Sequence, residues 1–134
     1  MVVAIDVGLK RIGVAISPDK KIILPQNAII RRGRKQASAE VSKLLKELKA
    51  KTLVVGIPLG GSSEEEMVRR IKHFVSLIDI DGVEVFFVDE AGSSFEAKEM
   101  MRGVTKQKRD GKIDSIAASI ILQRWLDEQK SKSL

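Results

Sequence analysis

The first seventeen residues contain two short apolar runs separated by a carboxylate, a glycine and two cations, and this segment constrains the fold most. Residues 2–5 and 12–16 are rich in branched side chains and bounded by glycine, which predicts two buried strands joined by a tight turn. Asp6 follows the first run directly. An ionised carboxylate there is costly unless it is paired, hydrogen-bonded or bound to a metal ion. Asp6 is therefore an ion-pair partner of Lys10 or Arg11, an acceptor for turn amides, or a functional group.

The absence of cysteine and the scarcity of histidine limit the kinds of catalytic and metal-binding site that the chain can form. The chain has 134 residues without a linker or internal repeat, so we expect one domain over 1–134. It has no cysteine and a single histidine, His73, whose place between core positions of its helix predicts a surface residue. Disulfides, thiolate nucleophiles, structural zinc and most histidine-based triads are thereby excluded. Carboxylates remain, and these are the ligands that suit Mg²⁺ or Mn²⁺.

The overall charge indicates the kind of partner. Lys and Arg number 24 against 18 Asp and Glu, which gives a net charge of +6 and an isoelectric point near 9.7. Such a balance favours a polyanionic partner. The longest uncharged stretch, 52–63, falls short of the roughly 20 apolar residues of a membrane helix, and Asp6 lies too early for a signal peptide. We expect a cytoplasmic protein with no membrane partner.

Hydrophobic periodicity along the rest of the chain predicts an α/β fold. The order of elements predicts a five-stranded mixed sheet, a three-stranded antiparallel meander plus parallel strands, with helices on both faces. The expected elements are a third strand over 22–30, in which Pro25 indicates an edge or a bulge, a helix over 37–50, a strand over 53–57, a helix opened by Ser62 or Ser63, a strand over 83–88 and a buried helix from about Asp114.

Three acids are expected at one end of this sheet. Asp6 follows the first strand, Asp89 and Glu90 follow the last, and Asp114 opens the buried helix. Ligands of such sheets bind beyond the carboxyl ends of the parallel strands. One or two divalent ions would relieve the repulsion between the carboxylates and would support phosphodiester hydrolysis. Singly, Asp114 could instead be an N-cap or helix-dipole partner, and Asp89 and Glu90 could be turn residues.

Other motifs carry less specific signals. Glu64, Glu65 and Glu66 fit a capped first helical turn better than a metal site. The segment 58–63 could present amides to a phosphate but lacks the lysine of a P-loop. Two basic segments predict phosphate contacts, with solvating charge as the alternative. Their cations are Arg31, Arg32, Arg34 and Lys35 in the first segment, and Lys106, Lys108, Arg109 and Lys112 in the second.

Four motifs in order along the chain resemble those of the YqgF (RuvX) family. They are AIDVGLKRIGVA at 4–15, VGIP at 55–58 ahead of Gly61–Ser62, VDE at 88–90, and KIDSIAA at 112–118 with ILQ at 121–123. The resemblance implies an RNase H-like fold related to the RuvC Holliday junction resolvases. It implies a metal-dependent nuclease that matures the 5′ end of 16S ribosomal RNA, or, in an older view, a junction resolvase.

The resemblance also assigns roles to particular residues. It carries the family's catalytic and metal-binding acids onto Asp6, Glu90 and Asp114, while the strand pattern alone leaves Asp89 as an alternative ligand to Glu90. It marks Lys10 and Arg11 as phosphate neighbours and the segment 103–112 as a basic loop beside the active site. The chain departs from the family at position 91, where Ala91 stands in place of the usual arginine.

Several functions are compatible with these features. The first is a nuclease that uses one or two Mg²⁺ or Mn²⁺ ions on structured RNA, a ribosomal RNA precursor above all. The second is a junction resolvase acting on branched DNA, which would need a symmetric dimer, although no dimerisation face is evident and we expect a monomer or weak homodimer. The third is a nucleic-acid-binding factor without catalysis. An actin-like ATPase is a fourth alternative, because Asp6-Val-Gly8 followed by a second strand also resembles the first phosphate motif of that fold. It is set aside because such enzymes close two lobes over ATP, and 134 residues hold only one.

Overall fold

The computed structural model describes residues 1–59, 64–91 and 112–132, with the side chains of 64 and 112–114 left out. None of the helices in these ranges combines the length and apolarity needed to cross a bilayer. The described elements are β1 (Val2–Val7), β2 (Arg11–Ser17), β3 (Leu24–Ile30), α1 (Arg34–Glu47), β4 (Thr52–Ile57), α2 (Glu64–Ser76), β5 (Glu84–Asp89) and α4 (Lys112–Lys132).

The strands form one five-stranded sheet in the order β3-β2-β1-β4-β5. The first three strands are antiparallel neighbours, whereas β4 pairs parallel to β1 and β5 parallel to β4. This confirms the predicted mixed sheet. Pro25 lies on the edge strand β3, where the missing N–H of proline costs no ladder hydrogen bond.

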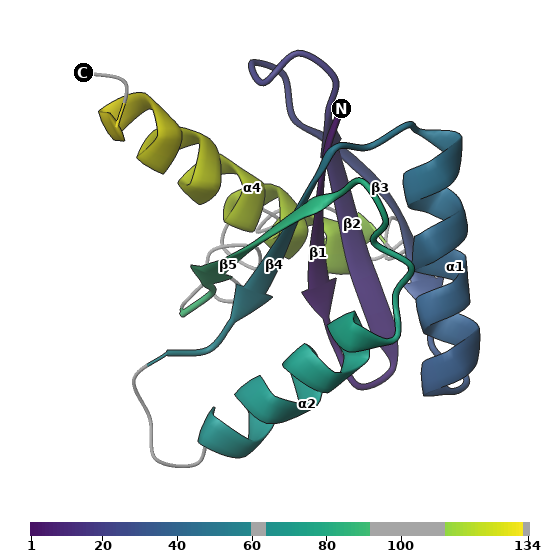
Figure 1. Ribbon diagram of the computed structural model, residues 1–134. Helices are drawn as coiled ribbons and strands as arrows, with labels where there is room; N and C mark the ends of the chain where they lie inside the picture. The colour runs from purple at the N-terminus through teal and green to yellow at the C-terminus, as the bar shows by residue number, and fades with distance from the viewer. Residues whose placement is uncertain (60–63, 92–111, 133–134) are drawn as a thin grey trace.

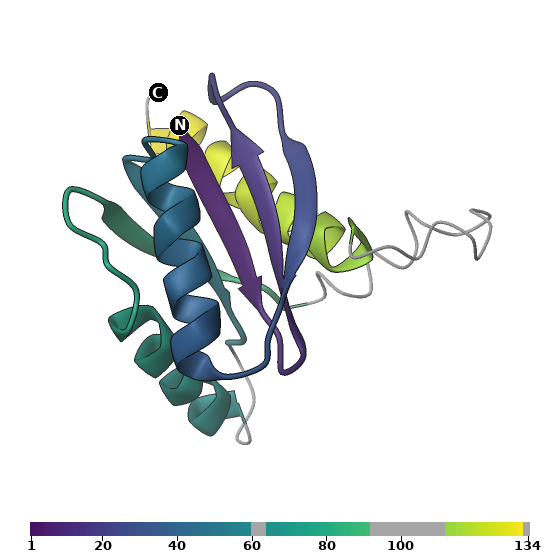
Figure 2. The same ribbon diagram turned by 90° about the vertical axis from the view of Figure 1, so that its right-hand side faces the viewer.

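Helices cover both faces of the sheet, with α1 and α2 on one face and α4 on the other (Figures 1 and 2). Side chains alternate along β1, so Val3 and Ile5 pack against α1 and α2 while Ala4 packs against α4. On the α4 face, Ala4 and Ala15 meet Ala118 of the helix. We attribute the close seating of α4 to these small side chains. The helix runs behind the strands, with its first turn beside β2 and β3 (Figure 2).

Helix α1 begins and ends three residues earlier than the predicted range of 37–50. The side-chain oxygen of Gln36 accepts the backbone N–H groups of Arg32 and Gly33 at 2.8 and 3.2 Å, which fixes the connection from β3 and lets the helix start at Arg34. At the other end, Lys49 has a φ of 52°, a left-handed conformation that ends a helix. Lys35 therefore lies in the first helical turn rather than in a loop.

Helix α4 begins at Lys112, two residues before the predicted start. Asp114 is therefore the third helical residue, which excludes the N-cap interpretation. Its place in the first turn still favours a negative charge through the helix dipole.

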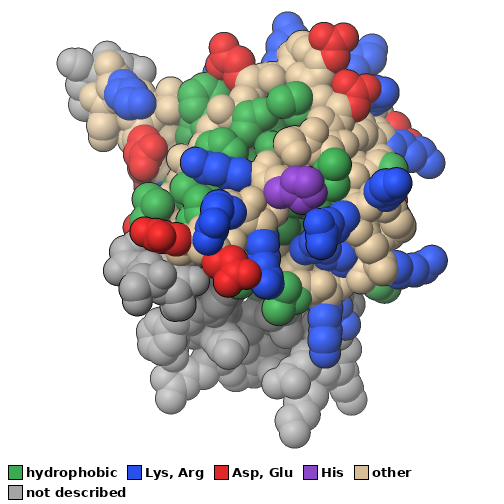
Figure 3. Space-filling view, turned by 60° about the horizontal axis from the view of Figure 1, so that its bottom comes forward, with side chains coloured by type: hydrophobic (Ala, Val, Ile, Leu, Met, Phe, Trp, Pro, Cys, Tyr) green, Lys and Arg blue, Asp and Glu red, His purple; other side chains and the backbone are tan. Residues whose placement is uncertain are grey.

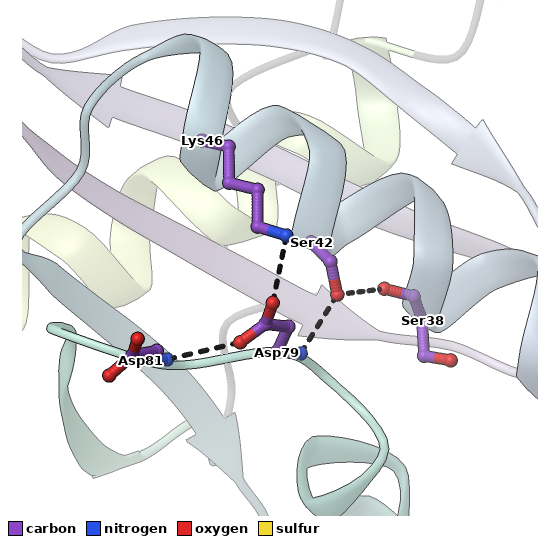
Figure 4. A network of polar contacts seen from close by, with 5 residues as sticks. All are labelled: Ser38, Ser42, Lys46, Asp79 and Asp81. Atoms are coloured by element: carbon purple, nitrogen blue, oxygen red, sulfur yellow. Dashed lines mark hydrogen bonds and ion pairs between the residues drawn. The ribbon is translucent and has the colours of Figure 1, made fainter.

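A polar network ties α1 to the connection between α2 and β5 (Figure 4). The ammonium of Lys46 pairs with the carboxylate of Asp79 at 2.8 Å, and the Asp79 N–H donates to the hydroxyl of Ser42 at 2.9 Å. The Ser42 hydroxyl donates in turn to the Ser38 carbonyl. These contacts fix the start of the chain segment that leads into β5.

Candidate active site

Asp6 lies near the carboxyl end of β1 and is half-buried. Side chains alternate along the strand, so Asp6 lies on the same face as Val2 and Ala4, the face that α4 covers. Its cross-strand neighbour on β2 is Gly13, which carries no side chain. Asp6 is thus the polar residue of an otherwise apolar strand, at the sheet end where β1, β4 and β5 all finish.

The turn after Asp6 depends on Gly8. The Gly8 N–H donates to the carbonyl of Arg11 at 3.0 Å, and a Cβ on Gly8 would lie 2.6 Å from that same oxygen. Any other residue would therefore force the turn open. The turn leaves Lys10 and Arg11 exposed at the end of β1, close in the chain to Asp6.

Glu90 reaches over the neighbouring strand at Gly56. A Cβ built on Gly56 would lie 2.9 Å from Oε2 of Glu90 and 2.4 Å from Cδ1 of Ile121, so both side chains occupy the space that glycine leaves. The Glu90 N–H donates to the Ile57 carbonyl at 2.8 Å, which continues the β4–β5 pairing. Because β4 lies between β5 and β1, the Glu90 carboxylate extends toward the strand that carries Asp6.

Asp89 has a different role from its neighbour. It alternates with Val88, which belongs to the α4 face, and so lies on the opposite face of the sheet. Its carboxylate accepts the backbone N–H groups of Ala91 at 2.9 Å and Leu59 at 3.3 Å. These bonds fit the turn-residue interpretation for Asp89, and they favour Glu90 as the acid of the pair that faces Asp6.

The first turn of α4 is fixed to β2 beside this site. The hydroxyl of fully buried Ser115 accepts the Val14 N–H at 3.1 Å, next to an irregularity in the β2–β3 pairing. Val14 adjoins Gly13, the cross-strand partner of Asp6. Asp114 precedes Ser115 in that turn, so the backbone places it near the end of β1, although its side chain lies outside the described residues.

Arg124 is a residue of this region that sequence reasoning missed. One guanidinium nitrogen donates to the carbonyls of Asp89 at 2.8 Å and Ala91 at 3.0 Å, on either side of Glu90. A signal was present, since Arg124 lies one helical turn after Ile121, the residue that packs over Gly56. The sequence did not reveal this role, because a cation next to the apolar face of a helix is usually a solvent-exposed side chain.

The donor chemistry of this site fits a hard divalent cation. Asp6 and Glu90 supply carboxylate oxygens, and the absence of a side chain at Gly56 provides the space into which Glu90 extends. Within the described side chains there is no group of three acids, histidines or cysteines that could hold a metal ion. The third acid, Asp114, is the one whose side chain falls outside that description.

The predicted phosphate-binding cations fall into separate groups. Arg31, Arg32 and Arg34 line a hollow on the α1–α2 face, whereas Lys35 borders a different hollow beside Ser38 and Asp79. The remaining predicted contacts, Lys106, Lys108, Arg109 and the side chain of Lys112, lie outside the described residues.

Known proteins resemble this chain along nearly its whole length. A family model described as "RuvX: Holliday junction resolvase" matches residues 1–128. A protein of Sulfurovum sp. named "Putative pre-16S rRNA nuclease" is 61% identical over 123 residues, which cover 92% of this chain and 95% of that protein. Proteins of the same name from Sulfurimonas denitrificans and Helicobacter hepaticus are 54% and 45% identical, each covering at least 95% of this chain and 97% of the relative.

Two solved structures share the fold. RuvC of T. thermophilus in complex with a Holliday junction substrate aligns with a TM-score of 0.62 at 17% identity, over 96% of this chain and 94% of that one. The Fowlpox virus resolvase in complex with Holliday junction DNA aligns with a TM-score of 0.53 at 14% identity, over 96% and 97%. At these identities the likeness shows the fold, which is the RNase H-like fold of resolvases.

Proposed function

The chain belongs to the RuvX family, and we propose that it is a divalent-metal-dependent endonuclease that hydrolyses phosphodiester bonds in structured RNA. The proposed substrate is the precursor of 16S rRNA, cleaved at its 5′ end, because relatives with up to 61% identity carry the name of that activity. The partner class is nucleic acid, in keeping with the net charge of +6.

One observation carries this proposal above the others. The Glu90 carboxylate occupies the space over Gly56, in the direction of the strand that carries Asp6, on the face where the first turn of α4 is fixed by Ser115. Asp6 of β1 and Glu90 after β5 thus lie at the same sheet end, on either side of β4, which carries Gly56.

Each residue of the proposed site has a separate role in the reaction. Asp6, Glu90 and Asp114 would hold one or two Mg²⁺ or Mn²⁺ ions, which when bound activate a water molecule and neutralise charge on the phosphate. The sheet fixes Asp6 and the β4–β5 pairing fixes Glu90, so the acids are oriented before substrate arrives. Ile121 fills the space over Gly56 beside Glu90. Lys10 and Arg11 would bind substrate phosphates beside Asp6.

A second candidate is cleavage of four-way DNA junctions, which the description of the matching family favours. That reaction needs paired nicks and therefore two sites related by symmetry. The two candidates share the acids and differ in substrate and oligomeric state.

A cleavage assay with purified protein separates these candidates. Labelled precursor 16S rRNA and a labelled four-way DNA junction are each incubated with magnesium, manganese or a chelator. We expect metal-dependent cleavage of the RNA near the mature 5′ end, and none by an Asp6→Asn variant that folds normally. Cleavage of the junction alone would support the second candidate, and no cleavage of either substrate would contradict the proposed function.

A further inference from the structure

A basic groove lies on the face of the sheet opposite α4. Its volume is about 840 Å³, and it is bordered by the β1–β2 turn, the β3–α1 connection and α2. Five arginines and the histidine lie in its wall: Arg31, Arg32, Arg34, Arg69, Arg70 and His73. Figure 3 shows this face, with lysine and arginine side chains gathered around the histidine. Arg69 and Arg70 of α2 join the basic residues after β3 only through the fold, because 35 or more positions separate them in the sequence.

Positive charge in the groove is poorly balanced. Among the described residues of its wall the one acid is Glu66, which pairs with Arg70 at 2.9 Å. Among the side chains that the structure describes, no carboxylate pairs with any of the other four arginines of the wall. Like charges gathered in this way repel one another, and a polyanion would relieve that repulsion.

Arg31 is held in place by contacts that leave its charge unneutralised. One of its guanidinium nitrogens donates to the Gly8 carbonyl at 2.9 Å, and its guanidinium carbon lies 5.2 Å from the centre of the buried Phe74 ring. A guanidinium carries five N–H donors in a planar fork that matches the oxygens of a phosphate. A preorganised arginine with donors to spare is suited to binding phosphate rather than to an ion pair within the protein.

The groove and the acidic site share the end of β1. Val7 lines the groove, and the preceding residue, Asp6, lies on the opposite face of the same strand. The β1–β2 turn separates the two features. A nucleic acid that passes over this turn would therefore meet acids on one side and arginines on the other.

We propose that the basic groove binds phosphate groups of the substrate backbone, next to the bond that is cleaved at Asp6 and Glu90. This role rests on the proposed nuclease function and deepens it by naming the surface that positions the substrate. The guanidinium groups of Arg32 and Arg69, which are exposed on opposite sides of the groove, would contact phosphates directly.

Binding measured without catalysis tests this proposal. Fluorescence anisotropy with a labelled precursor 16S rRNA fragment, and with a four-way DNA junction, is followed over a salt series in a chelator. We expect Arg32→Ala/Arg69→Ala to weaken binding and to reduce the log–log salt slope by about 1.4 to 1.8, the value for two lost phosphate contacts. The matched control is Lys43→Ala/Lys51→Ala, which removes the same charge from exposed positions outside the groove.

The control variant should keep most of the affinity and the slope. Equal losses in both variants would contradict the proposal, because they would show a response to net charge alone. Unchanged binding in the groove variant would also contradict it. Because binding is measured in a chelator, its result does not depend on catalysis. Failure of the wild-type protein to cleave in the separate assay with added metal would count against the proposed nuclease function and not against the groove.

Discussion

Gly56 is the residue whose replacement should disturb the site most directly without changing any charge. A Cβ there would lie 2.4 Å from Ile121 and 2.9 Å from the Glu90 carboxylate, so both side chains must move. We expect Gly56→Ala to lower the free energy of unfolding by about 1–3 kcal/mol, as for other overpacked sites. Cleavage should fall more than stability explains, because Glu90 is displaced.

Chemical denaturation and cleavage rates measure the two effects. Gly33→Ala is the control for stability, since a Cβ at Gly33 meets nothing within 4 Å. That variant should stay within about 1 kcal/mol of the wild type. A Gly56→Ala protein with wild-type stability and rate would show that Glu90 does not need this space.

Arg124 is expected to position Glu90 through the backbone of the turn. Arg124→Met removes the donor to the Asp89 and Ala91 carbonyls, so the turn should loosen. Loss of such a supporting contact costs roughly 10- to 100-fold in activity or metal affinity. We expect kcat to fall with little change in KM, and Arg124→Lys to restore part of the rate. Equal loss in the Lys and Met variants, or a change in KM alone, would argue against a positioning role.

At the scale of elements, the Lys46–Asp79 pair joins α1 to the connection before β5. The hydrogen bond and charge of Lys46 hold the pKa of Asp79 below its ordinary value of 3.8. The same contact raises the pKa of Lys46 above 10.5. The stabilisation by Asp79 is therefore present above pH 3.8 and is lost as the pH falls through the lowered pKa. Loss at the alkaline end begins only above pH 10.5.

Asp79→Asn should lower the Tm slightly at neutral pH, because both partners are well exposed and such pairs contribute little. The difference from the wild type should shrink as the pH falls from about 7 to about 2. Thermal unfolding at several pH values measures it, with Glu47→Gln as a control that removes a longer contact of 3.8 Å to Lys43. A difference that stays constant down to the lowest pH would contradict the assignment.

The elements were predictable to the extent that local pattern determines them. Buried strands such as β1 and β2 were predictable because short runs of branched apolar residues bounded by glycine have few alternatives. The ends of α1 did not, because its start depends on the side chain of Gln36 and its end on the backbone of Lys49. The placement of Asp6 and Glu90 at one sheet end followed from the predicted strand topology. The contacts of Arg124 and the proximity of Arg69 to Arg31 are tertiary, and the local sequence pattern does not indicate them.

In the molecule as a whole, the sheet lies between the acidic site on one face and the basic groove on the other. The α4 face carries Asp6 and Glu90 at the strand ends, and the opposite face carries the basic groove. Both features meet at the β1–β2 turn, whose tight geometry depends on Gly8. A substrate that crosses this turn would be held by positive charge while its phosphodiester bond reaches the acids.

The most direct test of this account compares two neighbouring acids. Cleavage of precursor 16S rRNA is measured over a manganese titration for the wild type, Glu90→Gln and Asp89→Asn. We expect Glu90→Gln to lose metal-dependent cleavage while remaining folded, because the Glu90 carboxylate lies over Gly56 facing the strand of Asp6. Asp89→Asn should retain most of the activity, because its carboxylate bonds turn amides on the other face. Full activity in Glu90→Gln, or selective loss in Asp89→Asn, would contradict the proposed site.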